Sequence, residues 1–122
     1  MNHPLATYLK RFFSHYLPVQ KGLSPHTLAA YRDAVKLLLC YLADTLKIAV
    51  DALSVEAITA ALVADFLDHL EQMRGCRTST RNARLAAIRS LFAFIAREEP
   101  VLLPQCQAIR AIPLKRDRKS VV

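Results

Sequence analysis

Hydrophobic residues recur along most of this chain at the three- and four-residue spacing of amphipathic helices. The clearest pattern lies between Ser24 and Leu46, where seven apolar or tyrosine side chains fall on one helical face. Ser24 is a typical N-cap residue, and Pro25 suits the first helical position, where no N–H is needed. The pattern predicts a helix that runs to about Leu46.

The same spacing predicts a helix on each side of this one. The first covers Leu5 to Leu17, and Pro18 is expected to end it because a proline ring clashes inside a helix. The other carries buried leucine, valine and phenylalanine side chains between Leu62 and Leu70 and stops at Gly75. The intervening residues, Asp51 to Thr59, lack this periodicity and are expected to form a loop or short turn.

A fourth helix is expected after residue 77, capped by Thr78 or Ser79. Pro100 and Pro104 bound a short connector, and a brief fifth helical turn is expected from Gln105 to Arg110. The sequence therefore predicts an all-α, compact four- to five-helix bundle over residues 1–112. Residues 113–122 are basic and aperiodic, as in an interdomain linker.

The composition excludes several classes of protein. No apolar run approaches the ~20 residues of a membrane span, and the N-terminus does not resemble a signal peptide, so a cytoplasmic location is expected. Cys40, Cys76 and Cys106 form no C-x-x-C pair, which makes a disulfide or metal framework an unfavoured interpretation. The 17 Lys and Arg residues against 10 Asp and Glu give a net charge of +7, which favours an anionic partner such as nucleic acid or a membrane surface.

The two signs of charge are segregated along the chain. Residues 51–71 contain five acids and no Lys or Arg, whereas residues 74–97 contain six arginines and no acid. We interpret Asp65, Asp68 and Glu71 as a solvated acidic face. Ordinary solvated helices intersperse both signs, so the basic stretch favours a binding surface.

The sequence contains no recognisable catalytic constellation. The histidines lie apart from cysteine or carboxylate ligands at zinc spacing, and no nucleophile elbow, Walker or glycine-rich phosphate motif occurs. We expect no catalytic residue, metal, cofactor or small-molecule substrate in this chain.

The starts of the second and fourth predicted helices are better candidates for function. Helix N-termini offer free N–H groups and a partial positive charge to a phosphate. Both bring hydroxyl groups to that point, and basic residues surround the second. Asn82 and Arg89 lie on the face of the fourth predicted helix that is turned away from its apolar stripe. They could read bases, because Asn can pair with adenine and Arg with guanine. The candidates are Ser24, His26, Thr27, Arg77, Thr78, Ser79, Thr80, Arg81, Arg84, Asn82 and Arg89. The alternative is that these residues have only a structural role, as ordinary helix caps and a solvated basic face. In that case His26 is an exposed residue without a function.

Two stretches resemble a known family. GLSPHTLAAYRDAVKLLLCYL, followed about 35 residues later by TSTRNARLAAIRSLFAFIA, resembles the N-terminal core-binding (SAM-like) domain of tyrosine recombinases of the phage-integrase and Xer type. The resemblance covers about Leu5 to Arg97. Each motif alone is moderately specific, and both in this order, with a basic segment after them, make the match strong.

The resemblance implies a bundle that forms half of a clamp around double-stranded DNA, with the second and fourth helices facing the major groove. It points to Ser24, His26, Thr27, Arg32, Thr78, Thr80, Arg81, Asn82, Arg84 and Arg89, although Arg32 and Arg84 could equally be structural. It also implies contacts with other recombinase protomers. The family's catalytic half has an H-x-x-R box and a late tyrosine, whereas this chain has no H-x-x-R and its last tyrosine is Tyr41. We therefore expect a non-catalytic part of a site-specific recombinase, with residues 113–122 leading to an absent catalytic domain.

A different class of function stays open at this point. The bundle could be a protein-interaction or oligomerisation module, in which the basic helix docks an acidic partner or the acidic third helix of another copy. A helix-turn-helix regulator is a weaker alternative, because its two helices need a joining turn of about three or four residues and no such pair stands out.

Overall fold

The structure, a computed structural model, describes residues 2–73 and 75–115. Its elements are, in order, α1 (Leu5–Arg11), the π-helical η1 (Phe12–Gln20), α2 (Pro25–Leu46), the short 3-10 turns η2 (Val50–Ala52) and η3 (Val55–Ala57), α3 (Ala60–Met73), α4 (Thr78–Glu98), a third 3-10 turn η4 (Pro100–Leu102), and α5 (Leu103–Arg110). This order confirms the predicted all-α bundle, with the fifth helix present.

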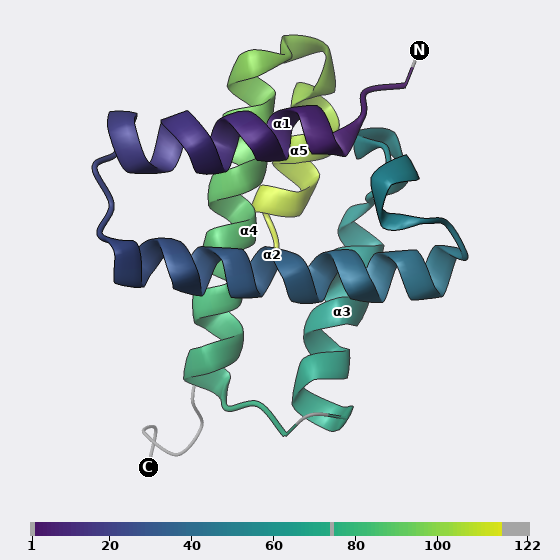
Figure 1. The fold of residues 1–122 in the computed structure, drawn as a ribbon. Helices are drawn as coiled ribbons and strands as arrows, with labels where there is room; N and C mark the ends of the chain where they lie inside the picture. The colour runs from purple at the N-terminus through teal and green to yellow at the C-terminus, as the bar shows by residue number, and fades with distance from the viewer. Residues whose placement is uncertain (1, 74, 116–122) are drawn as a thin grey trace.

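The helices cross in two layers (Figure 1). The continuous α1–η1 helix and α2 run antiparallel to each other; α2 lies across both α3 and α4, whereas the α1–η1 helix lies across α4. α5 packs along α4 at the end distant from the α3–α4 connection. The first halves of α2 and α4 therefore lie on one side of the molecule. They contain the two helix starts that the sequence analysis named as candidates for function.

The first helix does not end at Pro18, contrary to prediction. It continues to Gln20 as η1, with Pro18 inside it and the Lys21 N–H donating to the Tyr16 carbonyl over 2.8 Å. That bond spans five residues, which is the π-helical pattern, and the wider turn gives the proline ring room that an α-helix would deny it. The helix ends beyond it, before Gly22.

The second helix begins and ends as predicted. Ser24 is the N-cap, its Oγ accepts the Thr27 N–H over 3.2 Å, and Pro25 occupies the first turn. The helix runs to Leu46. Its buried side chains belong to the predicted apolar face, together with Ala34.

The segment between α2 and α3 consists of short turns, as expected. Hydrogen bonds to the N-terminus and to α5 hold it in place. Leu53 accepts the Leu5 N–H over 3.1 Å, and Val55 donates to the His3 carbonyl over 2.8 Å. Gln105 of α5 donates from Nε2 to the carbonyls of Val55 and Ile58, each over 2.5 Å. The N-terminus and α5 thus hold this segment against the bundle.

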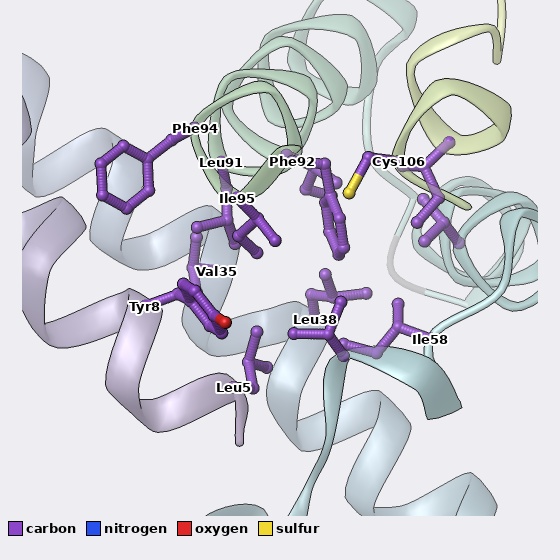
Figure 2. Packing of buried hydrophobic residues seen from close by; sticks show 14 of the residues in the cluster. Leu5, Tyr8, Val35, Leu38, Ile58, Leu91, Phe92, Phe94, Ile95 and Cys106 are labelled. Carbon is purple, nitrogen blue, oxygen red and sulfur yellow. The ribbon is translucent and has the colours of Figure 1, made fainter. Parts of the chain in front are cut away.

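All the helices contribute to one hydrophobic core (Figure 2). Phe92 of α4 lies between Cys106 and Leu38 of α2, and Ile95 of the same helix lies on the side of Val35. The predicted apolar stripe of the fourth helix is buried throughout: Leu85, Ile88, Leu91, Phe92 and Ile95. Because α4 lies at the centre of the core, its orientation determines how its basic first turns are presented.

Two details of α4 and α5 differ from expectation. Neither Thr78 nor Ser79 caps α4: the N-cap is Arg77, with extended backbone and no side-chain capping bond. α4 begins at Thr78, so the hydroxyls of Thr78, Ser79 and Thr80 fall inside its first turn. Gly75, in the connection before it, has a φ of +64°, which glycine adopts without strain. Pro104 lies in the first turn of α5 rather than before it.

Candidate nucleic-acid interface

The start of α2 presents its polar groups to solvent. Ser24 and His26 are exposed, and Thr27 is half-buried. The Ser24 hydroxyl donates to Thr27 Oγ1 over 3.1 Å, in addition to capping the helix. Arg32 is exposed one turn further on, with its guanidinium 6.0 Å from the centre of the Phe13 ring. These residues give the first two turns of α2 an accessible polar edge.

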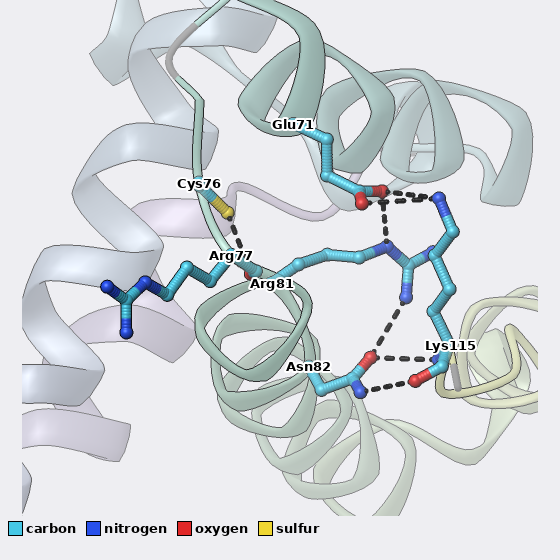
Figure 3. A network of polar contacts seen from close by, with 6 residues as sticks. All are labelled: Glu71, Cys76, Arg77, Arg81, Asn82 and Lys115. Atoms are coloured by element: carbon cyan, nitrogen blue, oxygen red, sulfur yellow. Dashed lines mark hydrogen bonds and ion pairs between the residues drawn. The ribbon is translucent and has the colours of Figure 1, made fainter. Parts of the chain in front are cut away.

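The start of α4 divides into an outward and an inward group. Arg77, Ser79 and Thr80 are exposed, and Thr78 is half-buried. The Cys76 thiol donates to the Arg77 carbonyl over 3.4 Å, while the Arg77 side chain points away from the neighbouring polar contacts (Figure 3). Its guanidinium is therefore available to an external anion.

A hollow of about 260 Å³ lies between α2 and α4, and Thr80 of the outward group is part of its lining. Small alanine side chains from both helices allow the close approach. Thr80 and Arg84 of α4 face Tyr31 and Asp33 of α2 across it; the full lining is Ala30, Tyr31, Asp33, Thr80, Ala83, Arg84 and Ala87. Arg89, half-buried, lies further along α4. The structure thus brings together side chains that are about 50 residues apart in the sequence.

Arg81 belongs to the inward group. It is 8% exposed, its Nε lies 3.3 Å from Glu71 Oε1, and its Nη1 donates to Asn82 Oδ1 over 3.1 Å. The Nε–H is not aligned for a hydrogen bond with Glu71, so this contact is an ion pair without one. A buried guanidinium needs such an acid nearby, because an unpaired charge in the interior is costly.

Asn82 also turns toward the protein. Its Nδ2 donates to the Lys115 carbonyl over 2.7 Å, and its Oδ1 accepts the Lys115 N–H over 2.9 Å (Figure 3). The Lys115 Nζ lies 3.0 Å from Glu71 Oε1 and 3.2 Å from Oε2. Asn82 thereby links α4 to the segment that follows α5.

The interpretation of Glu71 as part of a solvated acidic face is wrong. Asp65 and Asp68 are exposed, but the Glu71 side chain is 18% exposed and contacts Arg81 and Lys115. The end of α3 and the start of α4 lie side by side, so the acidic and basic stretches meet within one chain. Sequence spacing gave no signal for Lys115, which is distant in the chain and lies in the expected linker. Residues 116–122 of that linker lie outside the described part.

A second polar cluster, which the sequence did not indicate, lies at the N-terminus. The ring nitrogen Nδ1 of His3 is 2.5 Å from Glu56 Oε2, and the backbone N–H of His3 donates to Glu56 Oε1 over 2.9 Å. These two hydrogen bonds lower the pKa of Glu56 to about 2. His3 Nε2 also lies 3.9 Å from Glu99, whose carboxylate accepts the Tyr8 hydroxyl. Burial, helped by Glu99, raises the pKa of Tyr8. The cluster fastens the N-terminus beside a hollow of about 550 Å³.

Metal-binding chemistry finds no support among residues 2–73 and 75–115. In these ranges no three His, Cys, Asp or Glu side chains gather as a metal site would require. Cys40, Cys76 and Cys106 are free thiols, and burial raises the pKa of Cys106 to about 11. None of the helices in the same ranges is both long and apolar enough to cross a membrane.

Comparison with known proteins identifies the family. Residues 9–99 match the phage integrase N-terminal SAM-like domain. The chain belongs to this family. The match includes the whole of α2, α3 and α4, and with them most of the polar side chains described above. The family's role in DNA integration and recombination agrees with the resemblance found in the two helix-start motifs.

Curated relatives of this integrase-family chain come from Sinorhizobium fredii (strain NBRC 101917 / NGR234). The chain is 40% identical over 112 residues to a protein named "Putative integrase/recombinase y4rD", and 40% identical over 118 residues to "Putative integrase/recombinase y4rC". These alignments cover 92% and 97% of this chain, but 40% and 36% of the two relatives. The chain thus spans about two fifths of the length of the relatives it matches. No solved structure matches it significantly.

Proposed function

We propose that this chain is the DNA-binding, core-binding domain of a site-specific tyrosine recombinase, and that it grips double-stranded DNA with the first halves of α2 and α4. One observation carries the proposal: Thr80 and Arg84 share a hollow with residues of α2. A phosphate backbone running along this side could also reach the exposed polar groups at the start of α2 and exposed Arg77 at the start of α4.

The proposed contacts follow from accessibility. Ser24, His26 and Thr27 on α2, with Arg77, Ser79, Thr80 and Arg84 on α4, are positioned for phosphate contacts. Arg32 and Arg89 are farther along the helices and are proposed to reach the same duplex. Strand breakage and rejoining would be done by residues outside this chain, and other protomers of the recombinase would bind the same DNA.

The first experiment measures affinity for a mixed-sequence duplex by fluorescence anisotropy between about 50 and 200 mM salt. Binding should weaken steeply, with a slope of log K against log salt of about −0.9 per neutralised phosphate. Arg77→Gln and Arg84→Gln should each reduce the magnitude of that slope by about 1. Arg97→Gln, at the opposite end of α4, is the matched control and should leave it unchanged. A flat salt response, or no binding at low salt, would contradict the proposal.

The oligomerisation alternative has less support, because the acid at the end of α3 is already paired with Arg81 and Lys115 within the chain. Sedimentation with and without duplex separates the two functions. A stable oligomer that ignores DNA would favour the alternative.

A further inference from the structure

The segment after α5 is held against α4 by four residues, Glu71, Arg81, Asn82 and Lys115, which we call the linker latch (Figure 3). The Asn82 amide bonds both backbone groups of Lys115, at 2.7 and 2.9 Å. Glu71 contacts two cations, Arg81 and Lys115, at 3.3 and 3.0 Å. Three elements, α3, α4 and the start of the linker, therefore converge at one point.

Within the latch, the Asn82 side chain is committed. Its Oδ1 accepts from both Lys115 N–H and Arg81 Nη1, and its Nδ2 donates to a carbonyl. Reading adenine requires the same oxygen and the same amino group at once. An amide that holds Lys115 in this way does not offer that edge to a base.

We propose that the linker latch fixes the point at which the chain leaves the bundle, beside the first turns of α4, and that Asn82 is the positioning residue that holds it there. The sequence after Lys115 continues with three basic residues and one acid: Arg116, Asp117, Arg118 and Lys119. Lys115, the residue before this run, is held at the end of α4 that is proposed to contact DNA. In this respect the inference rests on the proposed function.

Hydrogen exchange of the Lys115 backbone amide tests the latch without DNA, on the full 122-residue chain by NMR. Asn82→Ala should accelerate this exchange about 3- to 10-fold, as expected when one or two exposed hydrogen bonds are lost. Asn82→Asp keeps the accepting oxygen and should accelerate it less. Gln72→Ala, which removes an exposed amide beside Glu71, is the control and should have no effect. Unchanged exchange in Asn82→Ala would overturn the latch.

A double-mutant cycle then tests its consequence for DNA binding. The second change neutralises the basic run in the intact chain, as Arg116→Gln, Arg118→Gln and Lys119→Gln together. Asn82→Ala should weaken duplex binding about 2- to 5-fold in the wild-type background, and have no further effect once the run is neutralised. Equal losses in both backgrounds would mean that Asn82 contacts DNA directly, and would overturn the positioning role. If the wild-type chain binds no DNA, the proposed function fails, while the exchange experiment still decides the latch.

Discussion

The starts of α2 and α4 look alike in the sequence but are built differently. Each brings hydroxyl groups to a helix N-terminus, with His26 and Arg32 further along α2 and arginines around the start of α4. At α2 the cap is local, a hydrogen bond between Ser24 and Thr27, and His26 and Arg32 remain exposed. At α4 no side chain caps the helix, and two of the predicted DNA contacts turn inward.

The difference comes from what packs beside each helix start. The first turns of α4 lie against the end of α3 and the start of the linker, which supply Glu71 and Lys115. The start of α2 follows a short loop after η1 and satisfies its polar groups within its own first turn. At the start of α4 an acid from another element pairs with Arg81 and keeps its side chain inward, whereas Arg77 stays exposed.

The largest expected effect concerns the inward group. Glu71→Ala leaves the buried Arg81 guanidinium without its acid, and should destabilise the domain by about 3 kcal/mol in urea unfolding. The double variant Glu71→Leu/Arg81→Met should recover most of that loss, because both charges are removed together. Asp68→Ala, an exposed acid on the same helix, should change stability by less than about 0.5 kcal/mol. A similarly small effect of Glu71→Ala would show that α4 does not depend on its neighbours.

The next largest effect is the loss of unfolding free energy when a hydroxyl is removed at the start of α2 or of α4. Ser24→Ala removes a capping hydrogen bond and should cost about 1 kcal/mol of unfolding free energy. Ser79→Ala should cost less than about 0.5 kcal/mol, because Ser79 caps nothing and alanine favours the helix interior. Thermal unfolding of both variants measures the difference. Equal losses would remove the distinction between the two helix starts.

The smallest expected effect is the pH dependence of stability that Glu56 contributes at a place distant in the sequence from both helix starts. The folded-state pKa of Glu56, about 2, is below its ordinary value of 4.5, so its contribution is fully present above about pH 4.5 and is lost as the pH falls toward 2. The side chain is about a third exposed, which limits that contribution to about 0.5–1 kcal/mol. Urea unfolding at pH 6 and pH 3 should therefore show a smaller pH dependence in Glu56→Gln than in the wild-type chain. An identical dependence would assign the acid sensitivity to other carboxylates.

Periodicity alone was sufficient for much of the fold. Val35, Leu38 and Leu42 of α2, and the stripe of α4, are buried as their spacing predicts, because a helix buries whichever face is apolar. The Ser24 cap and Pro25 were also predictable, since their partners lie within the same turn. These features depend on neighbours within about four residues.

Predictions failed where a distant segment or an unusual backbone decided the outcome. Pro18 is accommodated by a π-helical turn, which residue preferences do not indicate. Thr78 and Ser79 lie inside the first turn of α4 because the helix already begins at Thr78, with Arg77 as its N-cap. Glu71 and Lys115 were missed as partners of the candidate site, since 44 residues separate them.

The sequence by itself therefore determined the helical class, the main apolar faces and the family, because these depend on local spacing and on residue types in order. Only the tertiary structure decided which cations of the basic stretch face outward. Arg77 is exposed and Arg84 is half-buried at the hollow between α2 and α4, whereas Arg81 is paired with Glu71 and Asn82 holds Lys115. The physical reason is that a charge is available to a partner only if nothing in the folded chain neutralises it first, and that depends on residues brought together from three different elements.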